Sequence, residues 1–160
     1  NQKLGHQLPL EKIRLNEDEI RFYHSDQPWG EFSNFSQHSI FIDEINWLTV
    51  EHYYQAQKFI DKELRERIRL SKTPILAKTT ATEMNELRRS NWAELKESVM
   101  LEALRGKFTQ HPELAELLRT TSQKRLVEST SNDAYWGESR DGIGQNRLGE
   151  LLMLVRTELE

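Results

Sequence analysis

The chain of 160 residues contains no cysteine, which excludes disulfide bonds, a thiolate nucleophile and zinc sites built on cysteine. It has no apolar run long enough to span a membrane, so we expect no membrane partner. Its five histidines are scattered through the chain without the spacing of metal ligands, and we expect neither a metal nor a cofactor. These absences favour a single cytoplasmic domain.

The chain also lacks a large excess of positive charge. The net charge of −4 argues against a general nucleic-acid coat protein. The charge is uneven, however, because residues 51–110 carry 12 basic and 9 acidic side chains while both flanking thirds are acidic. The middle third is thus compatible with a phosphate-bearing substrate, although ordinary solvated helix faces would explain the same charges.

Short strand patterns and longer helix patterns together predict an α+β fold, a mostly helical single domain with a small β-sheet. Strands are expected at residues 20–23 and 125–129, and a hairpin at 39–48 that turns at Asp43-Glu44 without the favoured glycine. We place the domain at residues 20–160. Residues 1–19 lack periodicity and are predicted to form an N-terminal extension.

Most of the predicted helices follow a recognisable start signal. These signals are Thr49 before a helix to about Phe59, Asp61 before a helix to about Leu70, Thr73-Pro74, the capping-box pattern Asn91 to Glu94, and His111-Pro112. The last helix begins after residue 146 and carries leucines at helical spacing. Helix therefore dominates the chain after residue 49.

The loop at residues 24–36 is unusually aromatic, since it contains Trp29, Phe32 and Phe35. One interpretation is a hydrophobic plug that closes a small core. The other is a wall on which a flat base stacks, an interaction worth about 1–3 kcal/mol per base. The sequence leaves both open.

The helix after Thr49 carries Glu51, Gln55 and Lys58 at positions i, i+4 and i+7, which places them on one stripe. At a rise of ~1.5 Å per residue, the backbones of Glu51 and Lys58 lie about 10 Å apart. A substrate could fit between the carboxylate and the amine. Spacing alone still favours an ordinary solvated helix face.

A third candidate segment follows Asp133 and ends at the start of the last helix. Gly142, Gly144 and Asn146 precede that helix, where free backbone N–H groups can bind an anion. The alternative is a glycine turn in which Asn146 caps the helix. The loop is neither a Walker A motif nor a dinucleotide fingerprint, and the chain has no Gly-x-Ser-x-Gly elbow.

Four ordered blocks, spread over residues 20–156, resemble the NADAR, or YbiA-like, family of N-glycosidases. The blocks are Pro28-Trp29-Gly30-x-Phe32-Ser33-Asn34-Phe35; Trp47-x-Thr49-x-Glu51-His52-Tyr53-x-Gln55-Ala56-x-Lys58-Phe59; Arg89-x-x-Trp92 with Met100-x-x-Ala103-Leu104-x-x-Lys107-Phe108; and Asp133-x-x-Trp136-Gly137 with Asp141-Gly142-x-Gly144-x-Asn146-x-Leu148-Gly149-x-Leu151-Leu152-Met153 and Arg156. The departures are Glu44, where a turn glycine is common, and residues 75–86, which lack a glycine. We expect altered loop geometry there and no loss of chemistry.

The resemblance implies an enzyme that removes a ribosyl group from a nitrogen atom, with catalytic residues Lys58 and Glu51. Lys58 would attack the anomeric carbon to give a Schiff base, and Glu51 would transfer a proton to the ring oxygen or the leaving base. The substrate-binding residues that it implies are Asn34, Phe35, His52, Gln55, Trp92, Asp133, Trp136, Gly137, Gly144 and Asn146. No metal is implied.

Two substrate classes accompany the resemblance. The first is ADP-ribosylated guanine in nucleic acid, and the second is a small phosphorylated nucleoside-like intermediate of riboflavin synthesis. A closed-ring mechanism, in which Glu51 or Asp133 stabilises an oxocarbenium-like state, competes with the Schiff base. A non-catalytic module that binds ADP-ribose or a nucleotide is the remaining alternative.

Overall fold

The computed structural model describes residues 18–160. Its elements are β1 (Glu19–Phe22), the 3-10 helix η1 (Gly30–Phe32), β2 (Ile40–Ile42), β3 (Ile45–Trp47), α2 (Val50–Ala56), α3 (Lys62–Arg69), α4 (Pro74–Glu83), the 3-10 helix η2 (Asn85–Leu87), α5 (Trp92–Gln110), α6 (Pro112–Thr120), β4 (Arg125–Glu128) and α7 (Arg147–Glu158). The predicted α+β, mostly helical domain is confirmed. The strands, however, form two separate two-stranded sheets.

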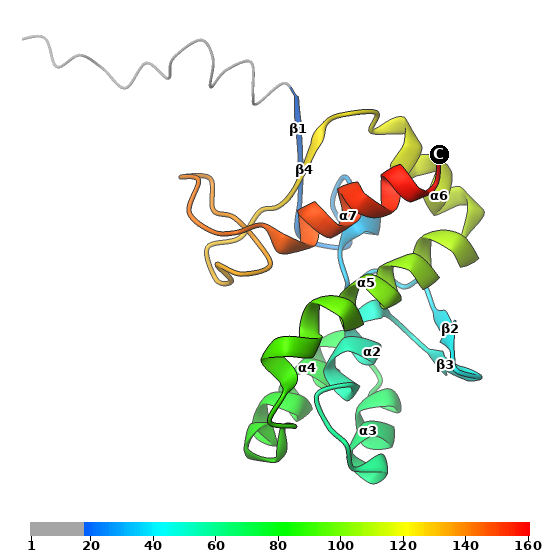
Figure 1. The fold of residues 1–160 in the computed structure, drawn as a ribbon, viewed down its shortest axis with the longest axis vertical. Helices are drawn as coiled ribbons and strands as arrows, with labels where there is room; N and C mark the ends of the chain where they lie inside the picture. The colour runs from blue at the N-terminus through cyan, green and yellow to red at the C-terminus, as the bar shows by residue number, and fades with distance from the viewer. Residues whose placement is uncertain (1–17) are drawn as a thin grey trace, which may run out of the picture.

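The first sheet joins β1 to β4, although about a hundred residues separate them in the sequence (Figure 1). The strands are parallel, with Glu19 opposite Arg125 and Phe22 opposite Glu128. The N–H of Arg125 also donates to the carbonyl of Asp18 at 2.8 Å. Asp18 and Glu19 thus belong to the folded domain, and the rest of the predicted extension, residues 1–17, lies outside the described residues.

The second sheet is the predicted antiparallel hairpin of β2 and β3. Its two turn residues, Asp43 and Glu44, have φ angles of 51° and 65°, so both adopt the left-handed conformation that a tight hairpin turn requires. A side chain in this region costs roughly 1–2 kcal/mol. The hairpin therefore forms without the glycine, at some local cost.

Side-chain caps explain where several helices begin. Thr49 Oγ1 accepts from the N–H of His52 at 3.1 Å, and Asp61 and Thr73 cap α3 and α4 in the same way. The capping box predicted at Asn91 is wrong. Asn91 makes no side-chain cap, because its Oδ1 accepts from Arg89 Nε at 3.0 Å instead.

Helix α2 is shorter than predicted. It ends at Ala56, and the next turns are closed by bonds from Lys58 N–H to the carbonyl of Gln55 and from Phe59 N–H to the carbonyl of Ala56. These i to i+3 bonds tighten the chain into a turn. Lys58 therefore follows the helix and does not continue its stripe.

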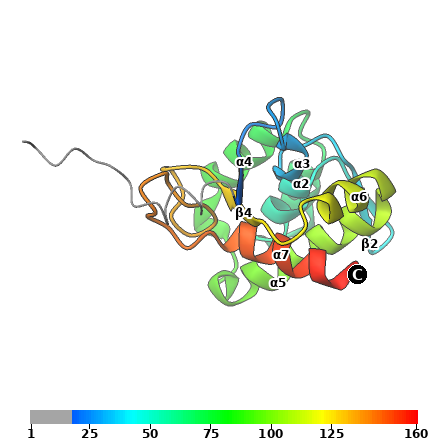
Figure 2. The same cartoon turned by 90° about the horizontal axis from the view of Figure 1, so that it is seen from above.

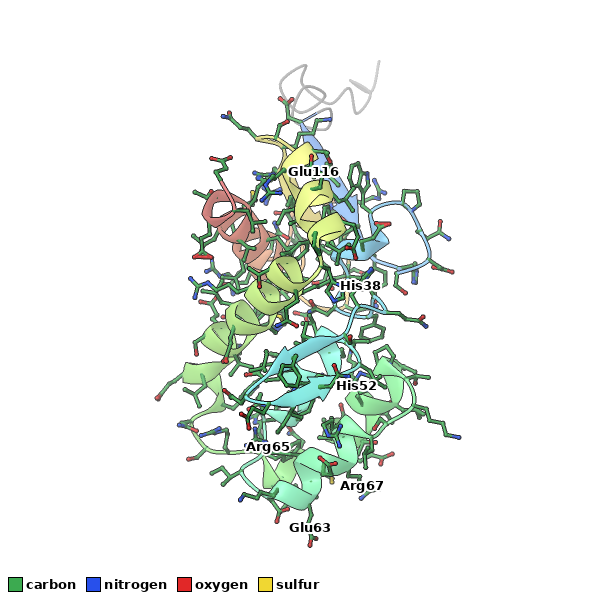
Figure 3. The ribbon with its side chains drawn as sticks, turned by 90° about the vertical axis from the view of Figure 1, so that its right-hand side faces the viewer. His38, His52, Glu63, Arg65, Arg67 and Glu116 are labelled. Atoms are coloured by element: carbon green, nitrogen blue, oxygen red, sulfur yellow. The ribbon has the colours of Figure 1, made fainter. Side chains whose placement is uncertain are left out.

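The long helix α5 connects the two ends of the molecule (Figure 1). Helices α2, α3 and α4 gather at one end, and β1, β4, α6 and α7 at the other; Glu63 on α3 and Glu116 on α6 mark these ends in Figure 3. Helix α2 packs against α3, α4 and α5, so every residue of it is buried. Within residues 18–160, no helix combines the length and apolar character needed to cross a bilayer.

Candidate active site

A cavity of about 710 Å³ brings the three candidate segments together. Its walls come from the loop before η1 and the chain after it, from α2 and the turn beyond, and from the segment after β4. That segment belongs to the long loop between β4 and α7, drawn in orange in Figure 2. The predicted site residues that line the cavity are Asn34, Phe35, Glu51, Gln55, Lys58, Asp133 and Trp136.

Glu51 lies in the first turn of α2 and is only 6% exposed, so it does not sit on a solvated helix face. Its N–H donates to the carbonyl of Asn34 at 3.1 Å, which ties the helix start to the preceding loop. Its Oε1 accepts from Gln55 Nε2 at 2.7 Å. Burial raises the pKa of Glu51, against the hydrogen bond from Gln55 and the positive charges of Lys78 and Lys58. The carboxyl is therefore held closer to its proton-carrying form.

Lys58 is half-buried in the turn after α2. Burial lowers the pKa of its amine; the negative charge of Glu51 opposes this effect and the nearby positive charge of Arg88 adds to it. The Nζ atom lies 5.6 Å from the centre of the Tyr54 ring. No carboxylate of residues 18–160 forms an ion pair with it within 4.0 Å. A larger neutral fraction is what a nucleophilic lysine requires.

Two amide side chains in the cavity carry oxygen atoms without a hydrogen-bond partner. These buried atoms are Oδ1 of Asn34 and Oε1 of Gln55. The Nδ2 of Asn34 contacts Sδ of Met100 at 3.6 Å, and the Nε2 of Gln55 is used by Glu51. An unpaired buried acceptor costs about 1–3 kcal/mol. Both oxygens can be satisfied by hydroxyl or N–H donors of a bound ligand.

Asp133 and Trp136 form the opposite part of the lining. Asp133 Oδ1 accepts from the N–H groups of Tyr135 and Trp136 at 3.0 and 2.9 Å, which fixes the turn. The Nε1 of Trp136 donates to Tyr54 Oη at 3.1 Å, and the two rings meet edge to face at 5.7 Å. Together with Phe35, these rings give the cavity an aromatic side.

The aromatic loop contributes both to the core and to the lining of the cavity. Phe32 is completely buried and packs against Phe22 and Phe108, whereas Trp29 stacks on Phe32 at 5.8 Å. Phe35 instead lines the cavity. The hydrophobic plug is thus present, and stacking of a base on Phe35 stays a prediction.

His52 and Trp92 do not reach the cavity lining, so the prediction that they contact substrate is not supported by their positions. His52, labelled in Figure 3, is fully buried with Nδ1 2.8 Å from Thr49 Oγ1 and Nε2 2.9 Å from the carbonyl of Ser71. Trp92 packs against Tyr54, with ring centres 5.2 Å apart. Both residues thus stabilise α2 through contacts outside the cavity.

The glycine loop, residues 142–146, also lies outside the lining, and packing requires a glycine at two positions, Gly144 and the preceding Gly137. A Cβ at Gly144 would lie 2.3 Å from the carbonyl oxygen of Gly137, and one at Gly137 would lie 2.4 Å from Cγ2 of Thr130. Close approach within the loop therefore requires these glycines. The predicted phosphate contact at residues 142–146 is not supported by this arrangement.

Asn146 is buried and adopts a φ angle of 49° directly before α7, but its side chain does not cap the helix. Its Nδ2 donates to the carbonyl of Leu126 at 2.8 Å, and its Oδ1 accepts from the N–H of Glu128 at 3.1 Å. Asn146 thus fastens the end of β4. Its position does not support the predicted contact with substrate, because Asn146 does not line the cavity and instead holds the backbone of Glu128, which does.

Several lining residues were missed from the sequence, chiefly Tyr54, Lys78 and Glu128. Burial, with the negative charges of Asp133 and Glu51, raises the pKa of Glu128 to about 7. Its place at the carboxyl end of a parallel strand is a signal that could have found it. In the part of the chain that the structure describes, no three His, Cys, Asp or Glu side chains are grouped so as to hold a metal ion.

A polar cavity that holds an amine with a lowered pKa and carboxyls with raised pKa values has the features of an enzyme active site. The family model of the NADAR domain matches residues 21–160. The chain therefore belongs to the NADAR family.

Individual relatives agree with this assignment. The chain is 48% identical over 140 residues to the N-glycosidase YbiA of Escherichia coli strain K12, covering 88% of each protein. The fold is similar to the NMR structure of the E. coli protein YbiA, with a TM-score of 0.81 over 88% of this chain and 84% of that one. It is also 39% identical to the chloroplastic riboflavin biosynthesis protein PYRR of Zea mays, where the match spans 88% of this chain and 25% of the maize protein.

Proposed function

We propose that the chain is an N-glycosidase that hydrolyses the bond between a ribose and a nitrogenous base. One observation carries the proposal: Lys58 and Glu51 face the same cavity, and burial pushes both toward their neutral forms. A neutral amine can attack carbon, and a protonated carboxyl can donate to a leaving group. Relatives named as N-glycosidases support the same class.

In this mechanism the lone pair of Lys58 Nζ forms a bond to the anomeric carbon. The bond from that carbon to the base nitrogen breaks, and the base leaves with the electron pair and a proton. The ring oxygen then leaves the anomeric carbon and takes a proton, which gives the Schiff base. Water adds to the Schiff base, and release of the amine returns Lys58 and the free sugar. Glu51 transfers protons in these steps.

The rest of the cavity suits a sugar joined to a flat ring. The unpaired oxygens of Asn34 and Gln55 can accept from sugar hydroxyls or base N–H groups. Phe35 and Trp136 offer aromatic faces or edges to the base. Asp133 Oδ1 already accepts two backbone hydrogen bonds in the turn. The second carboxylate oxygen of Asp133 is left as a further acceptor for the substrate.

Two substrate classes follow from the proposal. ADP-ribosylated guanine in nucleic acid is the first, and the basic middle third of the chain supports it. A phosphorylated nucleoside-like precursor of riboflavin is the second, and it is favoured by the name of the maize relative. In both substrates a ribose is bonded to a nitrogen atom.

The test is a chromatographic assay that measures release of ADP-ribose from ADP-ribosylated DNA and RNA, and release of the base from riboflavin precursors. Wild type is compared with Lys58→Ala and Glu51→Ala, and with Lys62→Ala as a control for an exposed lysine outside the cavity. We expect release by wild type and the control and none above background by the two site variants. Binding of ADP-ribose without release from any substrate would replace the enzyme by a binding module.

A further inference from the structure

Glu128 and Glu138 are neighbouring glutamates with opposite surroundings. The N–H of Glu138 donates to the carbonyl of Glu128 at 2.9 Å, so their backbones are joined directly. The carboxylate of Glu138 is held by Arg125 at 2.7 and 3.0 Å and by Arg21 at 3.1 Å. The carboxyl of Glu128 has no ion pair or side-chain hydrogen bond with any residue from 18 to 160. A structural role accounts for the first glutamate but not for the second.

The backbone of Glu128 is nevertheless fixed. It is the last residue of β4, lies opposite Phe22 in the parallel register, and donates its N–H to Asn146 Oδ1 at 3.1 Å. Side chains alternate along a strand, so Glu128 projects from the face of β4 opposite to that of Arg125. On that face it lines the cavity that also holds Lys58. The end of β4 thus holds the unpaired carboxyl of Glu128 at the cavity.

The charged groups that act on Glu128 come from three elements. Glu51 on α2 and Asp133 in the loop after β4 disfavour its ionised form, and Lys78 on α4 favours it. Burial is the largest effect and, with the two acids, raises the pKa of Glu128 to about 7. A group of this kind carries a proton in part of the population at neutral pH and can both give and take one.

We propose that Glu128 is a second proton-transfer residue of the site, which protonates the leaving base while Glu51 serves the ring oxygen. The inference rests on the proposed N-glycosidase function and refines it. Glu51 and Lys58 lie on α2 and the turn after it, whereas Glu128 enters from β4. Two acids on separate elements can each transfer a proton to one of the two atoms bonded to the anomeric carbon, the ring oxygen and the base nitrogen.

The proton balance is complete with these groups. The Glu128 carboxyl gives its proton to the base nitrogen as the bond between carbon and nitrogen breaks, and the base leaves as a neutral molecule. The resulting Glu128 carboxylate later takes a proton from the water that attacks the Schiff base. The residue is then protonated again and ready for the next turnover.

The test compares wild type with Glu128→Gln, which keeps the size of the side chain, and Glu128→Asp, which keeps the acid. The assay measures cleavage of the N-glycosidic bond in whichever substrate wild type cleaves, as kcat and KM between pH 5 and 9. Acid catalysis requires the protonated form, so wild-type kcat should fall as the pH rises through about 7. We expect Glu128→Gln to lower kcat at pH 6 by about 10²-fold or more with little change in KM, and to lose this alkaline limb. Glu128→Asp should retain the limb.

A folded Glu128→Gln enzyme with kcat within tenfold of wild type, or with the same alkaline limb, would overturn the inference and leave the N-glycosidase function intact. Equal losses in the Gln and Asp variants with an unchanged pH profile would also overturn it, because they indicate a packing role. A wild-type enzyme that cleaves none of the substrates is a different result, which contradicts the proposed function itself. Thermal unfolding of each variant verifies that it is folded.

Discussion

Two sets of charged side chains lie on opposite sides of the β1–β4 pair, and they differ in whether their members form ion pairs. On one side, Arg21, Arg125, Glu19 and Glu138 form a closed network with contacts of 2.7–3.2 Å. On the other side, the cavity is lined by Glu51, which is buried, and by Lys58 and Glu128, which are half-buried, and none of the three forms an ion pair within the described part of the chain. Only the first set therefore has its charges compensated by ion pairs.

The pKa values show what this difference means. The hydrogen bond from Arg125 lowers the pKa of Glu138, so the network stays ionised. In the cavity, burial raises the pKa values of Glu51 and Glu128 and lowers that of Lys58, so these groups move toward neutrality. Removing one partner of a paired set leaves an uncompensated charge and destabilises the fold, whereas unpaired titratable groups are available for proton transfer and nucleophilic attack.

The largest effect is expected from the nucleophile. Lys58→Ala should reduce cleavage of the N-glycosidic bond by at least about 10³-fold, because it removes the amine that forms the covalent intermediate. Lys58→Arg is the matched control, since it keeps the positive charge but cannot lose its proton. Equal, near wild-type rates in both variants would show that the amine takes no part. Single-turnover kinetics gives the comparison.

Glu51→Gln should follow, with a loss of about 10²–10⁴-fold in kcat, since the amide cannot transfer a proton. The hydrogen bond with Gln55 can persist in this variant, so the site should keep its shape. Thermal unfolding should show no loss of stability. A loss of stability in Glu51→Gln would instead show that the carboxylate of Glu51 stabilises the fold, as the ion-paired network does, and would contradict the comparison.

On the other side of the sheet, Glu138→Gln should act on stability and not on chemistry. Removing this carboxylate leaves Arg21 and Arg125 partly buried without their partner, and we expect a loss of about 3 kcal/mol in the free energy of unfolding by urea. Glu158→Gln, which breaks the exposed pair with Arg105, is the control and should leave the urea midpoint unchanged. Below its unfolding temperature, Glu138→Gln should retain wild-type kcat.

The smallest effect is a gain in stability. Because the folded-state pKa of Glu128 is raised to about 7, the folded protein binds this proton more tightly than the unfolded chain. Stability from this group is therefore present at low pH and is lost as the pH rises to about 7. Glu128→Gln should be more stable than wild type at pH 8, by about 1–3 kcal/mol, and equal to it at pH 4. Urea titrations at the two pH values measure the difference.

Local rules predicted much of the fold. Thr49, Asp61 and Thr73 cap their helices as expected, because a cap depends on a few neighbouring residues. The hairpin at Asp43-Glu44 was also predicted, although its left-handed residues show that packing of the strands can override turn preference. Asn91 failed as a capping residue because a nearby arginine, Arg89, competes for its oxygen.

The cavity was harder to predict, because it depends on contacts between distant segments. Glu51 and Gln55 were compatible with a solvated helix face, but packing of three other helices around α2 buries both, and Lys58 lies in the turn after the helix. Family blocks pointed correctly to the segments, yet they did not separate lining residues from supporting ones such as His52 and Asn146. That distinction requires the positions of partners far along the chain.

The most direct test of the central claim is borohydride reduction during turnover, followed by peptide mass spectrometry. If the amine of Lys58 is the nucleophile, substrate and borohydride together should leave a reduced sugar adduct on Lys58, and Lys58→Arg should carry none. Cleavage by wild type without any adduct on Lys58 would contradict the account. The reaction would then proceed on the closed sugar ring, with a carboxylate in place of the amine.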